Sequence, residues 1–414
     1  MLPPKNILYI NHYAGSREHG MEYRPYFLSR RWVKQGNSVS IIAASFAHTR
    51  KIQPEVKNDF SKTEIENIDY YFLKTPHYHG NGIMRFVNIL VFVLKLFLNA
   101  KKIARTFSPN LVIASSTYPL DVLPAYFIAK YSSAKLVYEV PDLWPLTLIE
   151  VGGFSRYHPF VLMLQFAENF AYKHCDFVVS CLPFSESHMR QHGLAEGKFI
   201  YIPNGLNKED WQHQKPLPTS LNDAIEIQKS EGKFLLGYAG YHGLANSLRT
   251  ICEAAGELLD DKYHFFFVGS GPEKTRIQDF CKREGINNIT FFESIDKAAV
   301  PEFLHLMDCN VIAFSDLPIY RFGVSTNKTF DYMMSARPIV QALTKSNDYV
   351  GDSGCGKTVP AETPSLFAKA ILEIAGLTPL EREVMGTKGK QYVLENNEYE
   401  ILATRYLQSV LGNK

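Results

Sequence analysis

Cysteine is scarce in this sequence, and the few cysteines present are not spaced as metal ligands. Six cysteines are scattered over 414 residues, without a Cys-x-x-Cys pair or a His/Cys spacing of the kind that binds zinc. The first residues also lack the charged flank and apolar run of a secretory signal. These absences argue against a secreted, disulfide-stabilised protein and predict a cytoplasmic one.

Acidic residues are missing from positions 70–120. Six basic side chains occur there: Lys74, Arg85, Lys95, Lys101, Lys102 and Arg105. Residues 1–205 carry 22 basic and 15 acidic side chains, whereas the rest of the chain carries 22 basic and 27 acidic ones. An anionic partner is therefore expected to dock on the first half of the chain.

The sequence also has no apolar run long enough to cross a bilayer. Its most apolar segment, residues 83–98, is interrupted by polar residues, and a spanning helix needs about twenty mostly apolar residues. The segment could lie in the membrane interface with its apolar face down. It could equally be a core helix of an α/β domain with a solvated basic tail. The first alternative predicts a protein peripheral to the inner face of the plasma membrane.

Strand-like apolar runs alternate with helical segments along the whole chain, as in doubly wound parallel sheets. A chain of this length, with 46% hydrophobic residues, is expected to form two domains with ample cores. A polar stretch with two prolines, residues 212–231, is predicted to belong to the linker. The expected strands are 7–10, 39–43, 70–73, 111–114, 136–140, 177–180, 199–202, 234–238, 263–268, 289–292, 311–314 and 339–342.

Residues 320–334 place a glycine turn, small polar residues, a lysine and a carboxylate at the start of one amphipathic helix. A helix N-terminus offers unpaired N–H groups and the positive end of its dipole to an anion. Gly323 would let the backbone approach closely, Lys328 would add a full charge, and Asp331 could reach a sugar hydroxyl. This arrangement suits a nucleotide diphosphate, and an ordinary helix cap is the alternative.

Residues 351–358 satisfy the P-loop expression G-x-x-x-x-G-K-[ST], with Lys357 as its lysine. A working P-loop needs a strand directly before it and a helix that opens at the Lys-Thr pair. Residues 347–350 make a poor core strand, and Pro360 prevents a helix from continuing. This segment is therefore not expected to bind a nucleoside triphosphate.

Gly269 and Gly271 form half of a dinucleotide-binding fingerprint after an expected strand. The third glycine is absent, and no acidic residue ends the next strand in the expected manner. We interpret the pair as a close approach of the backbone to a nucleotide and not as an NAD site.

The pattern Phe-Gly-x-Ser-x-Asn-Lys-x-Phe-Asp-Tyr-Met at 322–333, followed by Arg-Pro-Ile-Val, resembles the donor-binding helix of retaining GT-B glycosyltransferases of family 4. The likeness is strongest to the subgroup that builds bacterial surface polysaccharides such as O-antigen, lipopolysaccharide and capsule. Further segments follow in that family's order and cover nearly the whole chain: 6–10, 36–42, 142–145, 202–205, 237–240 and 268–272.

The resemblance implies an α/β, GT-B fold with two doubly wound Rossmann-like domains facing each other across a cleft. Residues 1–205 would form the acceptor domain, residues 206–386 the nucleotide-sugar domain, and residues 387–414 a helix that crosses back to the first domain. It also implies metal-independent catalysis without a cofactor, the nucleotide-diphosphate sugar being the donor substrate. No His, Asp or Glu grouping in the sequence suggested a metal site either.

The resemblance assigns Lys328, with the N–H groups around Thr326 and Asn327, to the leaving diphosphate. It assigns Asp331, which stands in place of a family glutamate, to the ribose hydroxyls of the donor. A second family glutamate, eight residues earlier, would touch the donor sugar, but this chain has Gly323 there. The residue that contacts the sugar is therefore left open.

Two other positions depart from the family pattern. Family members often carry a histidine directly before Asp142, where this chain has Pro141. Asp142 is a candidate for holding the acceptor hydroxyl, and a solvated loop carboxylate is the alternative. In residues 240–246, His242 or Asn246 would face the phosphates, although a lone histidine can also be structural. The other expected donor contacts are Gly20, Gly240, Gly269 and Ser325, and the candidates for a donor or acceptor phosphate are Arg17, Glu22 and Arg24.

Together these features predict a metal-independent, retaining transferase that moves a hexosyl or N-acetylhexosaminyl group from a UDP-sugar to a lipid-linked saccharide. The expected partners are the nucleotide sugar, that acceptor and a membrane surface, with no nucleic acid. Its catalytic residues would be Lys328, Asp142 and Asp331. A UDP-sugar epimerase of the same fold and a non-catalytic sugar-nucleotide-binding protein are the alternatives.

Overall fold

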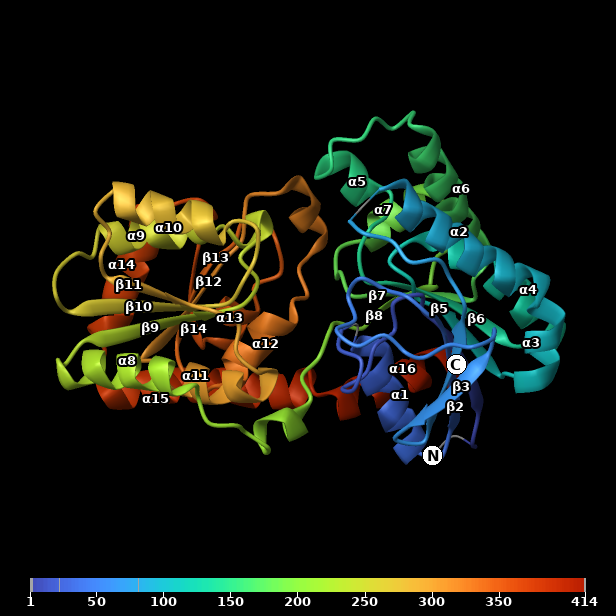
Figure 1. The fold of residues 1–414 in the computed structure, drawn as a ribbon, viewed down its shortest axis with the longest axis horizontal. Coiled ribbons are helices and arrows are strands. Elements are labelled where there is room, and N and C mark those ends of the chain that lie inside the picture. The colour runs from blue at the N-terminus through green and yellow to red at the C-terminus, as the bar shows by residue number, and fades with distance from the viewer. Residues whose placement is uncertain (1–2, 22, 81, 413–414) are drawn as a thin grey trace. The chain divides into compact units, whose positions relative to one another are not determined.

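The computed structural model describes residues 3–21, 23–80 and 82–412 and divides the chain into two compact units (Figure 1). Unit 1 comprises Met1–Asn204 and Tyr399–Lys414, and unit 2 comprises Gly205–Glu398. Each unit is a mainly parallel sheet with helices on both faces. The last segment of the chain therefore belongs to the same unit as the first.

Unit 1 contains a sheet with the strand order β3-β4-β2-β1-β5-β6-β7-β8, in which only the β3–β4 pair is antiparallel. The strands are β1 (Asn6–Ile10), β2 (Ser38–Ala44), β3 (Ser61–Ile65), β4 (Ile68–Leu73), β5 (Leu111–Ala114), β6 (Lys135–Val140), β7 (Phe177–Ser180) and β8 (Phe199–Tyr201). The α-helices are α1 (Arg24–Lys34), α2 (Ile83–Leu98), α3 (Ala100–Phe107), α4 (Val122–Ser132), α5 (Leu146–Glu150), α6 (Pro159–His174), α7 (Glu186–Gln191) and α16 (Tyr399–Leu411).

Unit 2 contains an all-parallel sheet with the strand order β11-β10-β9-β12-β13-β14. The strands are β9 (Phe234–Ala239), β10 (Tyr263–Val268), β11 (Ile289–Phe292), β12 (Cys309–Ala313), β13 (Ile339–Ala342) and β14 (Gly356–Val359). The α-helices are α8 (Thr219–Ser230), α9 (Leu248–Gly256), α10 (Lys274–Arg283), α11 (Val300–Leu306), α12 (Asn327–Met334), α13 (Tyr349–Ser353), α14 (Pro364–Ala375) and α15 (Pro379–Asn396).

Both sheets reverse their strand order at one point, which decides where a ligand can bind. In unit 1 the chain winds away in both directions from the neighbours β1 and β5, and in unit 2 it does so from β9 and β12. In open α/β sheets, ligands bind beyond the carboxyl ends of the strands at such a switch point. The two places to search are therefore the loops that follow β1 and β5, and the loops that follow β9 and β12.

All the strands expected from the sequence are present, with ends that shift by no more than two residues. Strand β3 was not anticipated, because its polar alternation, Ser-Lys-Thr-Glu-Ile, lacks an apolar run. It pairs with β4 through a two-residue turn, Glu66-Asn67, in which both residues have positive φ (49° and 62°). Such a turn matches the twist of an antiparallel hairpin. As an edge strand, β3 needs to bury only one face.

The prediction that residues 212–231 belong to the linker is wrong for the second part of this stretch, because α8 forms there. Leu221 and Ile225 lie one turn apart on this helix, and both are fully buried. Two apolar side chains on one stripe can dock a helix against a sheet even when its other positions are polar. The sequence pattern was too polar overall for that stripe to stand out.

The expectation of a single helix over residues 387–414 is also wrong, because parts of two helices lie in this segment. Helix α15 ends at Asn396, and α16 starts at Tyr399. Between them Glu398 pairs with Leu206 as an isolated parallel bridge, so the backbone cannot stay helical there. Helix α16 packs on α1 within unit 1, where the Trp32 indole N–H donates to the Ala403 carbonyl at 2.9 Å.

Helices α2 and α3 were examined together because the apolar segment expected at a membrane lies in α2. No single helix among the described residues is both long enough and apolar enough to cross a membrane. The two helices together reach the required length and composition, but the chain bends by 65° between them.

Candidate active site

The loop before α12 leaves the start of this helix without a side-chain cap. Gly323 has φ 114°, a left-handed conformation that favours glycine. The Asn347 side chain then fixes the next residue: it accepts from the Val324 N–H at 2.7 Å and donates to the Val324 carbonyl at 3.0 Å. Thr326 occupies the N-cap position, but its hydroxyl meets the Thr329 hydroxyl at 2.8 Å instead of capping the helix. In the first turn, the Thr329 N–H donates to the Thr326 carbonyl at 3.2 Å, whereas the N–H groups of Asn327 and Lys328 contact no acceptor among the described residues and can therefore face a ligand.

Lys328 reaches from the first turn of α12 into a partly aromatic setting. Its ammonium lies 2.7 Å from Asn246 Oδ1, 3.4 Å from the Tyr238 hydroxyl, and 4.8 and 5.6 Å from the ring centroids of Tyr238 and Phe314. Among the described residues no carboxylate pairs with it. Burial lowers the pKa of Lys328 from its ordinary value to about 7. A buried cation without a counter-ion is costly, so this site favours an incoming anion.

Lys274, a nearby lysine, has a different role. Its ammonium donates to the carbonyls of Gly269 and Phe292 at 3.1 and 2.8 Å and pairs with Glu293 at 2.7 Å. This lysine is thus neutralised within the protein, and it ties together the ends of β10 and β11. Lys328, by contrast, has no carboxylate partner among the described residues.

The glycines after β9 and β10 bring two loops into contact. A Cβ on Gly269 would lie 1.9 Å from the Gly240 carbonyl oxygen, so only glycine allows the loops to meet. A Cβ on Gly240 would lie 3.3 Å from the Lys328 side chain and 3.1 Å from the Tyr238 hydroxyl. Gly240 thus leaves room for Lys328 at the switch point between β9 and β12.

Asn246 and His242, one or the other of which was expected to face the phosphates, are placed differently. Asn246 contacts the Lys328 ammonium and also donates to the Tyr241 carbonyl at 2.8 Å. His242 is fully buried, and neither of its ring nitrogens has a hydrogen-bond partner among the described residues. Burial, followed by the Lys274 charge, lowers its pKa to about 4, so the ring is neutral at neutral pH. The His242 N–H donates to the Ser270 carbonyl at 2.9 Å, so the backbone at His242 is joined to the loop after β10.

Asp331 lies one helical turn after Lys328 but in other surroundings. Burial raises the pKa of its carboxyl group, and the charge of Lys297 and the side chain of Trp211 oppose that rise. Asp331 is half-buried, as is Ser325 before the helix, whereas Asn327 is exposed. Lys328 and Asp331 therefore both lie on α12, but their side chains have different neighbours.

Asp142 and Arg24 line one small cavity in unit 1. The cavity has a volume of about 140 Å³ and lies beyond the carboxyl ends of β1, β5 and β6; its lining residues are Asn11, Arg24, Pro25, Ser115, Thr117, Pro141 and Asp142. Asp142 accepts from the Leu143 N–H and the Thr147 hydroxyl, both at 2.9 Å. Burial raises the pKa of Asp142, which is half-buried and held by these two bonds.

Arg24, a candidate for a donor or acceptor phosphate, is engaged inside unit 1. It is buried at the start of α1, where it donates to the carbonyls of Pro203 and Ile202 at 2.7 and 3.0 Å. Its Nε lies 3.2 Å from Glu139, a buried carboxylate that also accepts from the hydroxyls of Tyr9 and Ser115. Sequence reasoning missed Glu139, although a glutamate inside an apolar strand was a signal of a buried network.

The first loop of unit 1 offers less to a phosphate than expected. The N–H of Gly20 already donates to the Ser16 carbonyl at 2.8 Å, and its carbonyl accepts from Ser16 at 3.1 Å. The loop is thus closed on itself at this glycine. Arg17 is exposed, and Glu22 lies outside the described residues.

The P-loop-like segment lacks the backbone context of a P-loop. Its first residues end α13, and its last residues, including Lys357, form β14, an edge strand. The Lys357 ammonium pairs with Glu373 on the surface of α14. The strand–loop–helix context that a P-loop needs is replaced here by helix–turn–strand.

Replacing Lys357 with alanine is therefore expected to leave glycosyl transfer and nucleotide affinity unchanged. The side chain makes one exposed ion pair, which is worth about 0–1 kcal/mol, so the variant should also fold normally. Steady-state kinetics and a phosphate-release assay with ATP test this expectation. Robust ATP hydrolysis that the substitution abolishes would reverse our ranking of the two glycine-rich segments.

Two family models match this chain. The model described as Glycosyltransferase Family 4 matches residues 19–210, and the model described as Glycosyl transferases group 1 matches residues 233–376. The two matches together span most of the chain. The chain belongs to glycosyltransferase family 4. The family resemblance drawn from the motifs is thus confirmed, and the α12 segment lies within the second match.

Individual relatives agree with this assignment. The putative colanic acid biosynthesis glycosyl transferase WcaI of Escherichia coli strain K12 is 27% identical over 210 residues, which cover 47% of this chain and 49% of WcaI. The chain thus matches about half the length of this relative. Sucrose-phosphate synthase from Thermosynechococcus elongatus matches the fold with a TM-score of 0.71, at 15% identity over 97% of both chains. Anabaena Alr3699/HepE in complex with UDP and glucose matches with a TM-score of 0.66, at 13% identity over 98% of this chain and 99% of that one. These likenesses confirm the expected GT-B fold.

Proposed function

We propose that this family 4 transferase moves a sugar, with retention of configuration, from a UDP-sugar to a lipid-linked saccharide during assembly of a surface polysaccharide. The observation that carries the donor part is the Lys328 ammonium, desolvated and without a carboxylate partner among the described residues, beside the open N-terminus of α12. The acceptor part is supported by the name of WcaI, which refers to colanic acid biosynthesis.

The roles of the residues follow from the charge that develops during transfer. Negative charge grows on the leaving diphosphate, so Lys328 and the first-turn N–H groups near Thr326 and Asn327 would stabilise it. Asn246 positions the ammonium because its Oδ1 accepts from Lys328 at 2.7 Å. Such stabilisation is stronger in a water-poor site than in bulk water. Asp331 is proposed to bind the ribose hydroxyls from the next turn.

The acceptor is proposed to approach unit 1 at the cavity beyond β1, β5 and β6. Asp142 would hold the acceptor hydroxyl there, because its carboxylate is fixed by the Leu143 N–H and the Thr147 hydroxyl. The carboxylate oxygens retain acceptor capacity beyond these two bonds. No covalent intermediate with the protein and no metal ion is part of this proposal.

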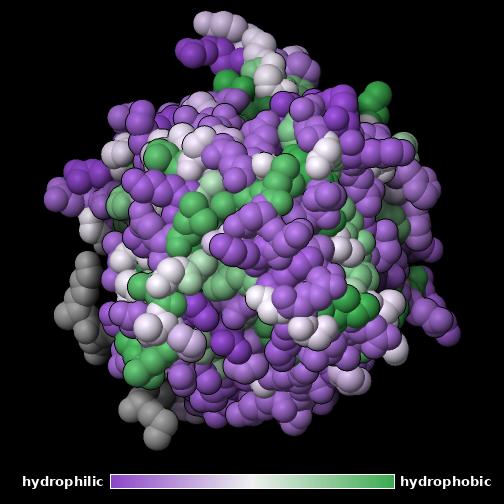
Figure 2. Space-filling view, turned by 90° about the vertical axis from the view of Figure 1, so that its left-hand side faces the viewer, coloured by the Kyte–Doolittle hydropathy of each residue, from purple (hydrophilic) through white to green (hydrophobic). Residues whose placement is uncertain are grey.

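A membrane surface is proposed as the place of the reaction, and α2 supports this. Apolar side chains on its outer face are exposed to solvent, among them Ile83 (81%), Leu94 (57%) and Leu98 (76%). The exposed basic side chains of Lys101 and Lys102 follow directly on α3. For comparison, Figure 2 shows a face of unit 2, where hydrophilic side chains cover most of the surface and apolar ones lie in small groups.

The donor proposal is tested by thermal unfolding of the protein with a panel of UDP-, GDP-, ADP- and dTDP-sugars. A ligand present at a hundred times its dissociation constant adds about 2.7 kcal/mol to stability, so the correct nucleotide should stand out. Slow hydrolysis of the stabilising sugar nucleotide would argue against a purely binding role. Interconversion of free UDP-sugars without an acceptor would instead identify an epimerase.

Donor affinity is expected to fall as the pH rises above 7. The pKa of Lys328 is about 7 in the ligand-free protein, so the ammonium is charged below this pH and must gain a proton to bind an anion above it. The dissociation constant of the stabilising UDP-sugar should therefore rise by up to about tenfold per pH unit between pH 7 and 8.5. Calorimetric titrations at several pH values measure this slope.

Lys328→Arg is the matched control for the pH dependence. Arginine remains protonated throughout this range, so the variant should bind with little pH dependence even if its affinity is lower. A wild-type affinity that stays constant from pH 6.5 to 8.5 would contradict a role for Lys328 in binding the diphosphate.

A further inference from the structure

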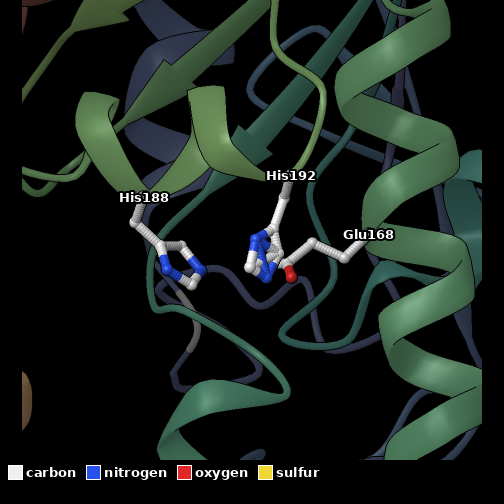
Figure 3. Close-up of side chains that lie close together, drawn as sticks. All are labelled: Glu168, His188 and His192. Atoms are coloured by element: carbon white, nitrogen blue, oxygen red, sulfur yellow. The ribbon is translucent and has the colours of Figure 1, made fainter.

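Three potential metal ligands meet in unit 1, away from the residues discussed above. Glu168 projects from α6, His188 from α7, and His192 from the residue after α7 ends (Figure 3). One ligand atom from each residue lies within 4.8 Å of the ligand atoms of the other two. The two helices flank β7 in sequence, so a group bound here would join the segments before and after that strand.

The two histidines share one side of a helical turn. They are four residues apart, and the His192 N–H donates to the His188 carbonyl at 3.2 Å, which continues the turn beyond α7. Their ring centroids are 4.4 Å apart. The same i, i+4 spacing of histidines on a helix is used in zinc sites. The sequence alone did not reveal this cluster, because Glu168 precedes the two histidines by a whole strand and the loops around it.

Glu168 is a buried carboxylate that is held in place by neutral donors. The Tyr172 hydroxyl donates to Oε1 at 2.8 Å, and the Gln165 side-chain amide donates to Oε2 at 2.8 Å. In the described part of the chain, no lysine or arginine pairs with it. Burial raises the pKa of Glu168 to about 7, because the negative charge is poorly solvated there. A cation would remove that penalty, and each oxygen still has acceptor capacity.

His192 adds a nitrogen that the protein leaves unused. Its Nδ1 is buried, and no described residue forms a hydrogen bond with it. Burial lowers the pKa of His192, which favours the neutral ring that can ligate a metal. Tyr172 resembles the outer hydrogen-bonding partners that orient ligating carboxylates in metal sites.

We propose that Glu168, His188 and His192 bind one divalent transition-metal ion, with zinc as the ion whose ligand preference fits two imidazoles and one carboxylate. Three protein ligands leave the fourth position of a tetrahedral zinc ion to water. The ion would act as a clamp between α6 and α7 within unit 1. It takes no part in the transfer reaction proposed above, so failure of either proposal leaves the other standing.

The test is direct measurement of zinc binding by the full-length protein. The protein is stripped with a chelator, dialysed against zinc chloride, and its metal content is compared with that of a His188→Gln/His192→Gln variant. Wild type should bind one zinc ion per chain, and the midpoint of its thermal unfolding should rise by several degrees. The variant should lose at least a hundredfold in affinity and show no such shift. His213→Gln, which alters an exposed histidine of unit 2, is the matched control and should behave as wild type.

Two further measurements distinguish a specific loss of zinc binding from misfolding and from nonspecific binding. His192→Gln alone changes a half-buried residue and should fold, as checked by circular dichroism, while it weakens zinc binding by at least tenfold. Cobalt substituted for zinc should give the visible absorption bands of a four-coordinate site in wild type and not in the double variant. The proposal is overturned if wild type binds no stoichiometric zinc, or if the double variant binds zinc as tightly as wild type.

Discussion

Replacing Lys328 with alanine is expected to lower the turnover of sugar transfer by about a hundredfold or more. The side chain is the one ammonium at the switch point of unit 2 that is not neutralised by a carboxylate among the described residues, and it lies beside the first turn of α12. Loss of one preorganised electrostatic donor typically costs a factor of this size. Steady-state kinetics with the UDP-sugar chosen from the stabilisation panel measure the effect.

Lys357→Ala is the control for this result. Both lysines lie in glycine-containing segments of unit 2, but Lys357 pairs with Glu373 on the surface. Turnover should therefore fall in the Lys328 variant alone. If Lys328→Ala transfers sugar at the wild-type rate, the start of α12 is an ordinary helix end and the proposed donor site has to be abandoned.

Changing Lys101, Lys102 and Arg105 to glutamine is expected to weaken binding to anionic vesicles by roughly two orders of magnitude. Each basic residue near an anionic bilayer contributes about 1 kcal/mol, and all three side chains are exposed on α3, which follows α2 in the chain. Added salt should weaken binding of the wild type as well, through screening. Co-sedimentation with anionic and neutral vesicles measures both effects.

A second triple variant controls for the change in net charge. Lys229, Lys262 and Arg283 are exposed basic residues of unit 2, and their change to glutamine removes the same charge. This control should sediment with anionic vesicles as the wild type does. If wild type stays in the supernatant while it remains folded and active on a soluble acceptor, α2 and α3 are helices of a soluble domain and the lipid-linked acceptor loses its main support.

The structure explains why this chain can have a glycine, Gly323, where the family has a glutamate. Gly323 stands where family members carry a glutamate against the donor sugar, and its φ of 114° belongs to the turn that leads into α12. A glutamate would be strained in that conformation. The loop of this chain is instead held by Asn347, which binds both the N–H and the carbonyl of Val324. In the proposed donor site, a side-chain contact to the sugar would therefore come from another residue.

Local sequence patterns determined the elements of the fold. Apolar runs of four to six residues marked the buried parallel strands, because such strands are covered on both faces and need no polar side. The start of α12 was also readable, since a glycine, small polar residues and a lysine act within one turn of the chain. The P-loop-like segment was rejected correctly on the same local grounds, because Pro360 prevents the helix that such a loop requires.

Only the tertiary structure decided what the charged and polar side chains do. Arg24 was expected to meet a donor or acceptor phosphate, but it is buried in unit 1, where Glu139, more than a hundred residues away, supplies its counter-charge. His242 and Asn246 are neighbours in one loop, yet contacts with the β10 loop bury the first and contacts with Lys328 engage the second. The cluster of Glu168 with His188 and His192 likewise arises only when α6 packs near α7. Burial and pairing depend on distant segments that fold together, so these properties have no signature in the local sequence.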